Sequence, residues 1–461
     1  MKRKILFGLM LAIVVACLCV PAFALTEGDW EFQLLDDEVT ITGYLGNAEN
    51  VVVPETLFGV PVTKIEIDNS EKSLGRAKSV KFPSQLKELK NGVLGYYSKA
   101  LESAVLPEGL EKIENGVFSD CEELKFINLP AGLKYIGDYA FSNCTGLTAV
   151  DLPAGLSFLG DRAFSNTGLV ELSWPFMPDL NYSHSDAWNI FADCKKLEKV
   201  TLGYGTPGVP GGTFNGCISL KEVNLPNTVT YIDNSLSGGA FEECSALKSI
   251  ILPTSLKIIE SGAFRETGLA EVIIPYGVEE ISSGSFAYIP SLKSLYMPDT
   301  VKVMASDIIY DSDNCIIYCA KDSYVAETCK KYSISFLTDK SVNSGITVLY
   351  NGTRVSFHTY DQNPELINDR TLVPLRAIFE AMDADVFWDD ATSTVRAVRD
   401  GVVVEIAIGA NVMHKNGETI PVDVPAQLIN DRTMIPVRVI AEAFGAQVGW
   451  NDAGRVVLIS E

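Results

Sequence analysis

Apolar residues recur along much of the chain in one frame: Leu-x-x-apolar-x-Leu-Pro, then Leu-x-x-Ile, then Ala-Phe. The frame is clearest in CEELKFINLPAGLKYIGDYAF from Cys121, CTGLTAVDLPAGLSFLGDRAF from Cys144 and CSALKSIILPTSLKIIESGAF from Cys244. The Leu-Pro step returns at equal intervals at Pro107, Pro130 and Pro153, and looser copies end at Pro83, Pro175, Gly203, Pro226, Pro253, Pro275 and Pro298. A fixed period of this length predicts a solenoid.

Each unit predicts one short strand and a return segment. Leu124, Ile127 and Leu129 place apolar side chains on the inner side of the strand, and Pro130 ends it because proline cannot donate to a ladder. One unit cannot bury this face alone, so the units stack and their strands form a parallel sheet.

This frame resembles that of leucine-rich repeats, and its IGDYAF...C..L version is similar to the BspA-like subclass. The resemblance covers about Val51 to Thr338. It implies a parallel-β solenoid that serves adhesion to host matrix or to other cells.

The pattern changes after residue 345. The stretches LYNGTRV, VRDGVVV and HKNGETI carry Asn-Gly or Asp-Gly between strand-like runs, which predicts β-hairpins. LINDRTLVPLRAIFEAMDA from Leu366 returns as LINDRTMIPVRVIAEAFGA from Leu428. Pro374 and Pro436 suit the first turn of a helix, and apolar residues follow them at helical spacing. We therefore expect a small duplicated α+β domain with β-hairpins and two helices, in which the repeated arginines bond to carbonyls or carboxylates.

The two LINDRT..P.R units, followed by V.WDD and V.WND, resemble the copper amine oxidase N-terminal-like (stalk) domain. The resemblance covers Ile346 to Ser460 and implies an accessory extracellular module without an established ligand. Amine oxidase chemistry needs three copper-binding histidines and a tyrosine within Asn-Tyr-Asp/Glu. The chain has only His184, His358 and His414, and Asn181-Tyr182 is followed by Ser183. We therefore expect no enzyme activity, no cofactor and no metal, and no other catalytic motif occurs.

The start of the chain predicts export. Lys2, Arg3 and Lys4 precede an apolar run, and Ala22 and Ala24 suit cleavage after residue 24. Lipidation at Cys17 is the alternative. The expected organisation is a signal peptide at 1–24, an N-terminal lead-in at 25–50, the solenoid with its C-terminal cap at 51–339, a linker at 340–345 and the stalk domain at 346–461. The mature protein is then secreted and associated with the cell surface.

Charge and cysteine content narrow the possible partners. A net charge of −22 disfavours nucleic acid and anionic membranes, and no later segment is apolar enough to insert into a bilayer. A protein or a cell-wall glycan remains as the expected partner. Five cysteines occupy one slot of successive units, which predicts small buried side chains and leaves a disulfide open: Cys121, Cys144, Cys194, Cys217 and Cys244.

Two features are candidates for the binding surface. One lengthened unit contains the aromatic residues and histidine Trp174, Phe176, Tyr182, His184 and Trp188, which either hold a ligand or pack the loop onto the solenoid. One exposed strand position becomes apolar at Ile251, Ile273 and Tyr296, as a partner site or as a seat for the next domain. We expect a surface protein that binds or adheres through its solenoid. The alternatives are a structural envelope protein that binds peptidoglycan or wall polysaccharide through its C-terminal domain, and a carbohydrate-active enzyme or its accessory subunit.

Overall fold

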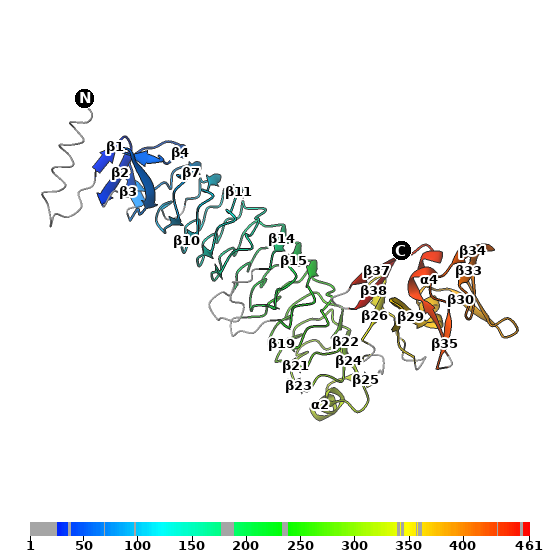
Figure 1. Cartoon of the computed structure of the whole chain (residues 1–461). Coiled ribbons are helices and arrows are strands. Elements are labelled where there is room, and N and C mark those ends of the chain that lie inside the picture. The colour runs from blue at the N-terminus through cyan, green and yellow to red at the C-terminus, as the bar shows by residue number, and fades with distance from the viewer. Residues whose placement is uncertain are drawn as a thin grey trace. The chain divides into compact units, whose positions relative to one another are not determined.

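The computed structural model describes residues 25–35, 38–68, 70–95, 98–176, 189–232, 238–338, 342, 345–355, 357, 362–430, 432–451 and 455–461. The chain divides into two compact units, Met1–Gly168 and Leu169–Glu461. In the solenoid part of each unit, short strands are stacked in the order of the sequence (Figure 1).

The first unit begins with a five-stranded sheet in the order β1-β2-β3-β6-β5. Its strands are β1 (Leu25–Glu27), β2 (Trp30–Leu35), β3 (Glu38–Tyr44), β5 (Thr56–Leu57) and β6 (Val60–Ile65). The neighbours β1, β2 and β3 run antiparallel, and β3 and β6 run parallel. Phe32 of β2 and Val39 and Ile41 of β3 are fully buried, so one face of this sheet is apolar and covered.

The predicted solenoid follows in the same unit, as two parallel sheets. One contains β4 (Asn50–Val52), β7 (Ser79–Lys81), β9 (Ser103–Val105) and β11 (Phe126–Ile127), and the other contains β8 (Glu88–Leu89), β10 (Lys112–Ile113), β12 (Tyr135–Ile136) and β13 (Phe158–Leu159). Lys112 pairs with Tyr135, and Tyr135 pairs with Phe158, so each partner lies one sequence period further along. This register confirms that one repeat forms one turn.

The second unit begins with three further parallel sheets. The first contains β14 (Glu171–Trp174), β15 (Lys199–Leu202) and β17 (Glu222–Asn224). The second contains β16 (Gly208–Val209), β18 (Tyr231–Ile232), β19 (Ile258–Ile259), β21 (Glu280–Ile281) and β23 (Val303–Met304). The third contains β20 (Glu271–Ile273), β22 (Ser294–Met297), β24 (Ile316–Cys319) and β25 (Phe336–Thr338). Helix α2 (Tyr324–Tyr332) lies between β24 and β25. The Ser323 side chain accepts a hydrogen bond from the Ala326 N–H and caps this helix. The solenoid therefore ends in a strand, a helix and a strand.

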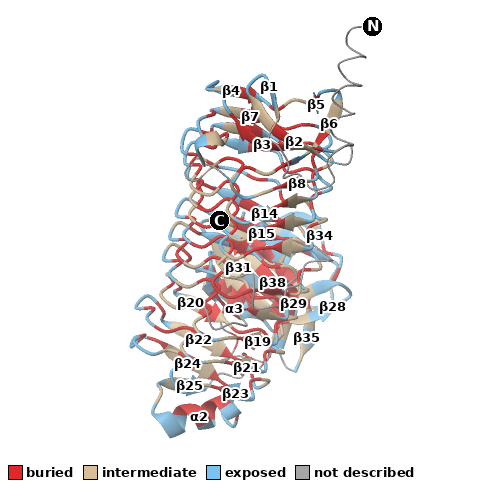
Figure 2. Ribbon diagram, turned by 90° about the vertical axis from the view of Figure 1, so that its left-hand side faces the viewer, coloured by how far each residue is buried: buried red, intermediate tan, exposed pale blue. Residues whose placement is uncertain are grey.

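The core of the solenoid in each unit contains a column of phenylalanines. Phe141 stacks between Phe118, at 5.0 Å between ring centroids, and Phe164, at 4.9 Å. A second column in the other unit joins Phe214, Phe241, Phe264 and Phe286. Every ring in both columns is fully buried, and buried residues occupy the interior of the turns in Figure 2. One aromatic side chain per turn therefore supplies much of the apolar area.

The residue before the repeat slot that holds cysteine or threonine has a left-handed conformation, which explains why it is often Asn or Asp. The φ angles are 59° at Asp120, 61° at Asn143 and 52° at Asn166. Their side chains also form a ladder, because Asn143 Nδ2 donates to Asp120 Oδ1 at 2.8 Å and Asn166 Nδ2 donates to Asn143 Oδ1 at 2.9 Å. The turn is thereby held by both backbone and side chain.

The cysteine slot holds a small buried donor. Cys144 Sγ donates to the Phe118 carbonyl of the preceding turn at 3.1 Å, and Thr167 Oγ1 donates to the Phe164 carbonyl at 3.0 Å. All eight described cysteines are buried free thiols. Burial raises the pKa of Cys121 and of Cys315 to about 12, so these thiols are inert.

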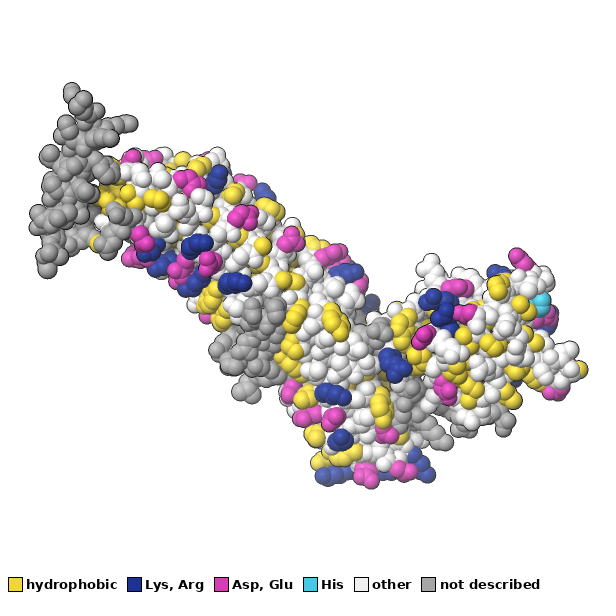
Figure 3. Space-filling model, viewed as in Figure 1, with side chains coloured by type: hydrophobic (Ala, Val, Ile, Leu, Met, Phe, Trp, Pro, Cys, Tyr) yellow, Lys and Arg dark blue, Asp and Glu magenta, His cyan; other side chains and the backbone are white. Residues whose placement is uncertain are grey.

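Opposite charges alternate on the solenoid surface. Lys87 faces Glu111 at 3.2 Å, and Lys125 faces Glu102 at 3.4 Å. Dark blue and magenta side chains are accordingly mixed on the face shown in Figure 3. Because both partners of these pairs are largely exposed, each pair contributes little to stability.

The C-terminal part of the second unit contains the predicted hairpins. Its sheets are β27-β26-β38-β37, β28-β29-β36-β35 and β30-β31-β32-β33-β34. The strands are β26 (Thr347–Tyr350), β27 (Thr353–Arg354), β28 (Glu365–Ile367), β29 (Arg370–Pro374), β30 (Asp385–Asp389), β31 (Thr394–Arg399), β32 (Val402–Ala407), β33 (Val412–Lys415), β34 (Glu418–Pro421), β35 (Gln427–Ile429), β36 (Arg432–Pro436), β37 (Gln447–Asn451) and β38 (Val456–Ser460). The Asn-Gly and Asp-Gly pairs at 351, 400 and 416 have positive φ at both residues, as a type I′ turn requires.

The two copies of the repeated sequence pair with each other about a local twofold axis. Strands β29 and β36 are antiparallel, and Val373 pairs with Ile435, its own equivalent in the second copy. Leu372 pairs with Pro436, and Pro374 pairs with Met434, which are reciprocal positions. The duplication therefore forms an internal dimer with one shared sheet.

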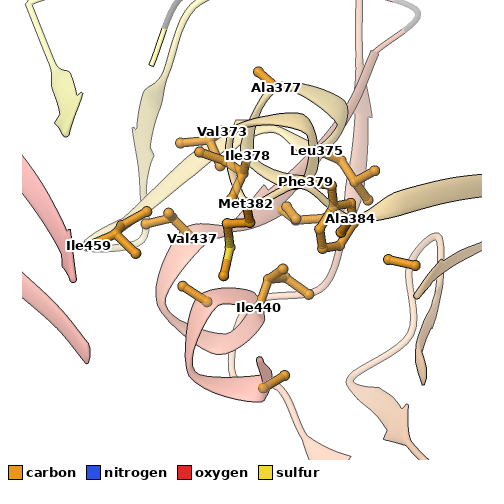
Figure 4. Packing of buried hydrophobic residues seen from close by; sticks show 14 of the residues in the cluster. Val373, Leu375, Ala377, Ile378, Phe379, Met382, Ala384, Val437, Ile440 and Ile459 are labelled. Carbon is orange, nitrogen blue, oxygen red and sulfur yellow. The ribbon is translucent and has the colours of Figure 1, made fainter. Parts of the chain in front are cut away.

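Helices α3 (Leu375–Ala381) and α4 (Val437–Ala443) start directly after these strands. Pro374 and Pro436 are each the last residue of the strand and the N-cap of the helix. The sequence predicts them one position later, in the first turn of the helix. Figure 4 shows Phe379 and Met382 of the first copy directed toward Val437 and Ile440 of the second. All four are at most 4 % exposed, so the two copies share one core.

The phenylalanine column yields a stability prediction. We expect Phe141→Ala to lower the free energy of unfolding by about 3–5 kcal/mol, because it leaves a cavity between two stacked rings. Phe126→Ala is the matched control: Phe126 is 64 % exposed in the same unit, and its loss should change stability by less than about 0.5 kcal/mol. Urea unfolding of the full chain measures both, and equal effects would contradict the column as a source of stability.

The thiols yield a second prediction. In the folded protein without residues 1–24, none of the eight cysteines should react with Ellman's reagent at mildly alkaline pH. Burial both shields the thiols from the reagent and raises their pKa. All eight should react once guanidinium chloride unfolds the chain without a reductant. If fewer than eight thiols react in the unfolded chain and a reductant restores the number to eight, the chain contains a disulfide.

Candidate functional site

The lengthened unit does not present Trp174 to solvent. Trp174 ends β14, is 1 % exposed, and lies 5.7 Å from Phe191 and 6.4 Å from Phe214 between ring centroids. Strand alternation directs it inward, which corrects the expectation that it belongs to the binding surface. Phe176 is 37 % exposed and its ring lies against Gly205, where an added Cβ would come within 2.7 Å of that ring. Tyr182, His184 and Trp188 lie outside the described residues.

The apolar strand position is half-buried at all three of Ile251, Ile273 and Tyr296. The Arg354 guanidinium lies 4.3 Å from the centroid of the Tyr296 ring, and the Arg354 N–H donates to Glu271 Oε1 at 3.1 Å. Burial raises the pKa of the Glu271 carboxyl and of Tyr296. These contacts favour the interpretation of this position as a seat for the domain that follows.

The second unit also contains a polar groove that the sequence did not indicate. The groove runs beside four successive turns, and we call it the tyrosine groove: Glu242, Glu260, Arg265, Tyr288, Asp307 and Tyr310. The rings of Tyr288 and Tyr310 are 5.5 Å apart in an edge-to-face arrangement, and Tyr310 is 61 % exposed. The Arg265 guanidinium lies 4.7 Å from the centroid of the Tyr288 ring. Exposed aromatic rings beside charged groups are typical of recognition sites.

The charges of the tyrosine groove are unequal. Arg265 faces Glu242 at 3.4 Å. Asp307 accepts a hydrogen bond from Ser283 Oγ at 2.7 Å, and Glu260 accepts one from Ser282 Oγ at 3.3 Å. Burial raises the pKa of the Glu260 carboxyl. With three carboxylates and one guanidinium, the groove is acidic and suits a cationic ligand.

A second lengthened unit borders this groove and was the signal that we missed. Pro226 and Pro253 lie further apart in the chain than Pro107, Pro130 and Pro153 do. The extra residues precede Gly238 and Gly239, which line the groove. A Cβ at residue 239 would lie 1.9 Å from the Gly262 carbonyl oxygen, so only glycine fits this close approach. Insertions in solenoids often mark a binding face.

The repeated Asn-Asp-Arg-Thr of the C-terminal domain is a hairpin element. Asn368 and Asp369 join β28 to β29 with φ of 50° and 58°, a type I′ turn. Arg370 Nε donates to Asp423 Oδ2 at 2.6 Å, and Arg370 Nη1 donates to the Asp369 carbonyl at 3.1 Å. The predicted bonding of the arginines within the domain is confirmed at Arg370. Arg438 lies 4.0 Å from Glu442, so only an ion pair is seen there.

The structure shows no candidate metal site in the described part of the chain. It contains no cluster of His, Cys, Asp or Glu that could hold a metal ion. His414 is exposed on β33, with its Nδ1 3.2 Å from Thr419 Oγ1. His184 and His358 lie outside the described residues. No helix of the described ranges is long and apolar enough to cross a bilayer.

A solenoid of leucine-rich-repeat turns and a duplicated hairpin domain define the class, and the comparisons agree. The model "BspA type Leucine rich repeat region" matches residues 62–181 and 187–316 in six copies, and "Copper amine oxidase N-terminal domain" matches residues 349–459. The chain belongs to the BspA-type leucine-rich repeat family, whose match covers more than half of it. The second match lies on the duplicated hairpin domain of the C-terminal part.

Three solved structures are similar to the chain. A leucine-rich repeat protein from Bacteroides ovatus is 18 % identical over 71 % of this chain and 82 % of that one, with a TM-score of 0.48. A leucine rich cell surface protein from Faecalibacterium prausnitzii is 20 % identical over 69 % and 99 %, with a TM-score of 0.37. The pneumococcal vaccine antigen PcpA is 18 % identical over 70 % and 100 %, with a TM-score of 0.41. No curated protein matches the chain.

The hairpin turn yields a prediction. We expect Asp369→Val to lower the free energy of unfolding by about 1–2 kcal/mol, because a β-branched residue is strained in the left-handed conformation. Asp369→Gly, which removes that strain, should leave stability unchanged or raise it. Thermal unfolding of the full chain compares them, and equal losses would assign the importance of Asp369 to its carboxylate.

Proposed function

We propose that the chain is an exported bacterial surface protein that binds a partner through its solenoid and has no enzymatic activity. The tyrosine groove carries this proposal. It combines Tyr288 and Tyr310 with a surplus of carboxylates beside a lengthened unit. These features favour a basic segment of another protein as ligand, since charge complementarity attracts it and the rings provide contact area.

The division of labour follows the repeats. In this proposal, residues 1–24 are removed on export, 25–50 lead into the solenoid at 51–339, and 340–345 link it to the stalk domain at 346–461. Membership of the BspA-type family supports the assignment of binding to the solenoid. The stalk domain spaces the solenoid or associates it with the wall.

Binding of the full mature chain to an array of basic peptides and matrix proteins tests the groove. For the best binder, we expect Tyr310→Ala to weaken binding about tenfold, which is the loss of one buried aromatic contact of about 1.4 kcal/mol. Tyr204→Ala is the matched control, because Tyr204 is 79 % exposed in the same unit and lies outside the groove. Equal losses for both variants would contradict the assignment.

The pH dependence of binding provides a further prediction. Burial raises the pKa of Glu260, so this carboxylate loses its charge at a higher pH than an ordinary glutamate does. Affinity for a basic peptide should therefore fall on mild acidification. Glu260→Gln should weaken binding at neutral pH and should remove the part of the pH dependence that comes from this carboxyl. Titration calorimetry measures both, and an identical profile in the variant would contradict a role for Glu260.

A further inference from the structure

Strand β37 (Gln447–Asn451) is the terminal strand of the sheet β27-β26-β38-β37. Among the described strands it pairs with β38 alone. The outer edge of a terminal strand presents backbone N–H and C=O groups to which another strand can bond. Proteins usually protect such an edge with charged side chains, a proline or a covering segment.

A groove runs beside β37, and Val448, Gly449 and Trp450 all line it. Val448 and Trp450 lie on the same face of the strand, because alternate side chains point to opposite faces. Gly449 has no side chain, so its backbone is uncovered between them. Buried valines of α4 and β38, Val437 and Val457, form part of the groove lining.

The opposite wall comes from the other sequence copy. Leu366 of β28 is 49 % exposed there, and the ion pair of Arg370 and Asp423 lies beside it. Asp369 and Arg438 also line the groove, so the two positive and two negative charges cancel. The groove is therefore apolar with a balanced polar rim.

The duplication supplies an internal comparison for this edge. The equivalent strand β30 is also terminal in its sheet, and it carries Asp385 and Asp389 at its two ends. The β37 counterparts in the second copy are Gln447 and Asn451. Gly449 likewise replaces Phe387 in the middle of the strand. Strand β30 thus carries a charged side chain at each end, and β37 carries none.

We propose that β37 is a docking site for an extended segment of a partner protein, which adds to the sheet as a further strand. The backbone of Gln447–Gly449 provides the hydrogen bonds, and Gly449 permits close approach of another backbone. Alternate apolar side chains of the segment enter the valine-lined groove. The balanced rim selects a segment with little net charge. This site lies in the C-terminal domain, so it is independent of the ligand proposed for the tyrosine groove.

The test uses the full mature chain and a short, terminally blocked, fluorescein-labelled peptide in which valine alternates with threonine. We expect saturable binding by fluorescence anisotropy and slower hydrogen exchange at Gln447–Gly449. Gln447→Asp restores the charge of the equivalent strand, and Gly449→Phe restores its side chain. Each should weaken binding about tenfold, the equivalent of about 1.4 kcal/mol. Thr419→Asp is the matched control, because it adds the same charge at an exposed strand position outside the groove.

Three outcomes would overturn the proposal. Unchanged affinity for both β37 variants would show that the peptide binds elsewhere. Equal affinity for the peptide N-methylated at every central residue would exclude strand addition, because that peptide cannot donate backbone hydrogen bonds. Concentration-dependent self-association that Gln447→Asp abolishes, with no peptide binding, would show that the edge takes a second copy of the chain. Variants of Tyr310 should leave peptide binding unchanged, so failure here is separable from failure of the tyrosine groove.

Discussion

A solenoid turn can bury its apolar face only against the turn beside it, and the rest of the structure depends on this constraint. Equivalent residues must then stack at the spacing of neighbouring strands. Phenylalanines form columns with ring centroids 4.9 to 5.6 Å apart. Left-handed residues fall at the same point of each turn, which Asn and Asp tolerate, and the slot after them needs a small buried donor such as Cys144 or Thr167.

The same constraint explains where function can be sought. Positions inside a turn must match their neighbours, so residues that break the period are the ones that can form a site. Both lengthened units break it. In one, Trp174 enters the core and Phe176 packs on backbone. In the other, Gly238 and Gly239 line a groove with exposed tyrosines and an excess of carboxylates. The second is therefore the better candidate for recognition.

The C-terminal domain solves the burial problem by duplication instead of stacking. Two copies share a sheet at Val373 and Ile435 and share a core between their helices. The sheets outside the shared one end in the terminal strands β30 and β37. The two copies differ in the side chains that these strands carry. The repeated Asn-Asp is a turn and the repeated Arg370 ties it to Asp423, so the most repetitive stretch maintains the fold. The differences between copies carry the functional signal.

The sequence by itself determined the solenoid, its turn length, its cap and the duplicated hairpin domain, because these follow from periodic burial and from turn chemistry local to a few residues. Trp174 stands before Pro175 in the slot that Leu129 holds before Pro130, so the repeat frame itself places it inside. Only the tertiary structure showed that Tyr310 is exposed beside Tyr288. The tyrosine groove and the edge of β37 are built from segments distant in the chain, and that proximity depends on stacking and on the twofold pairing, which no local pattern records.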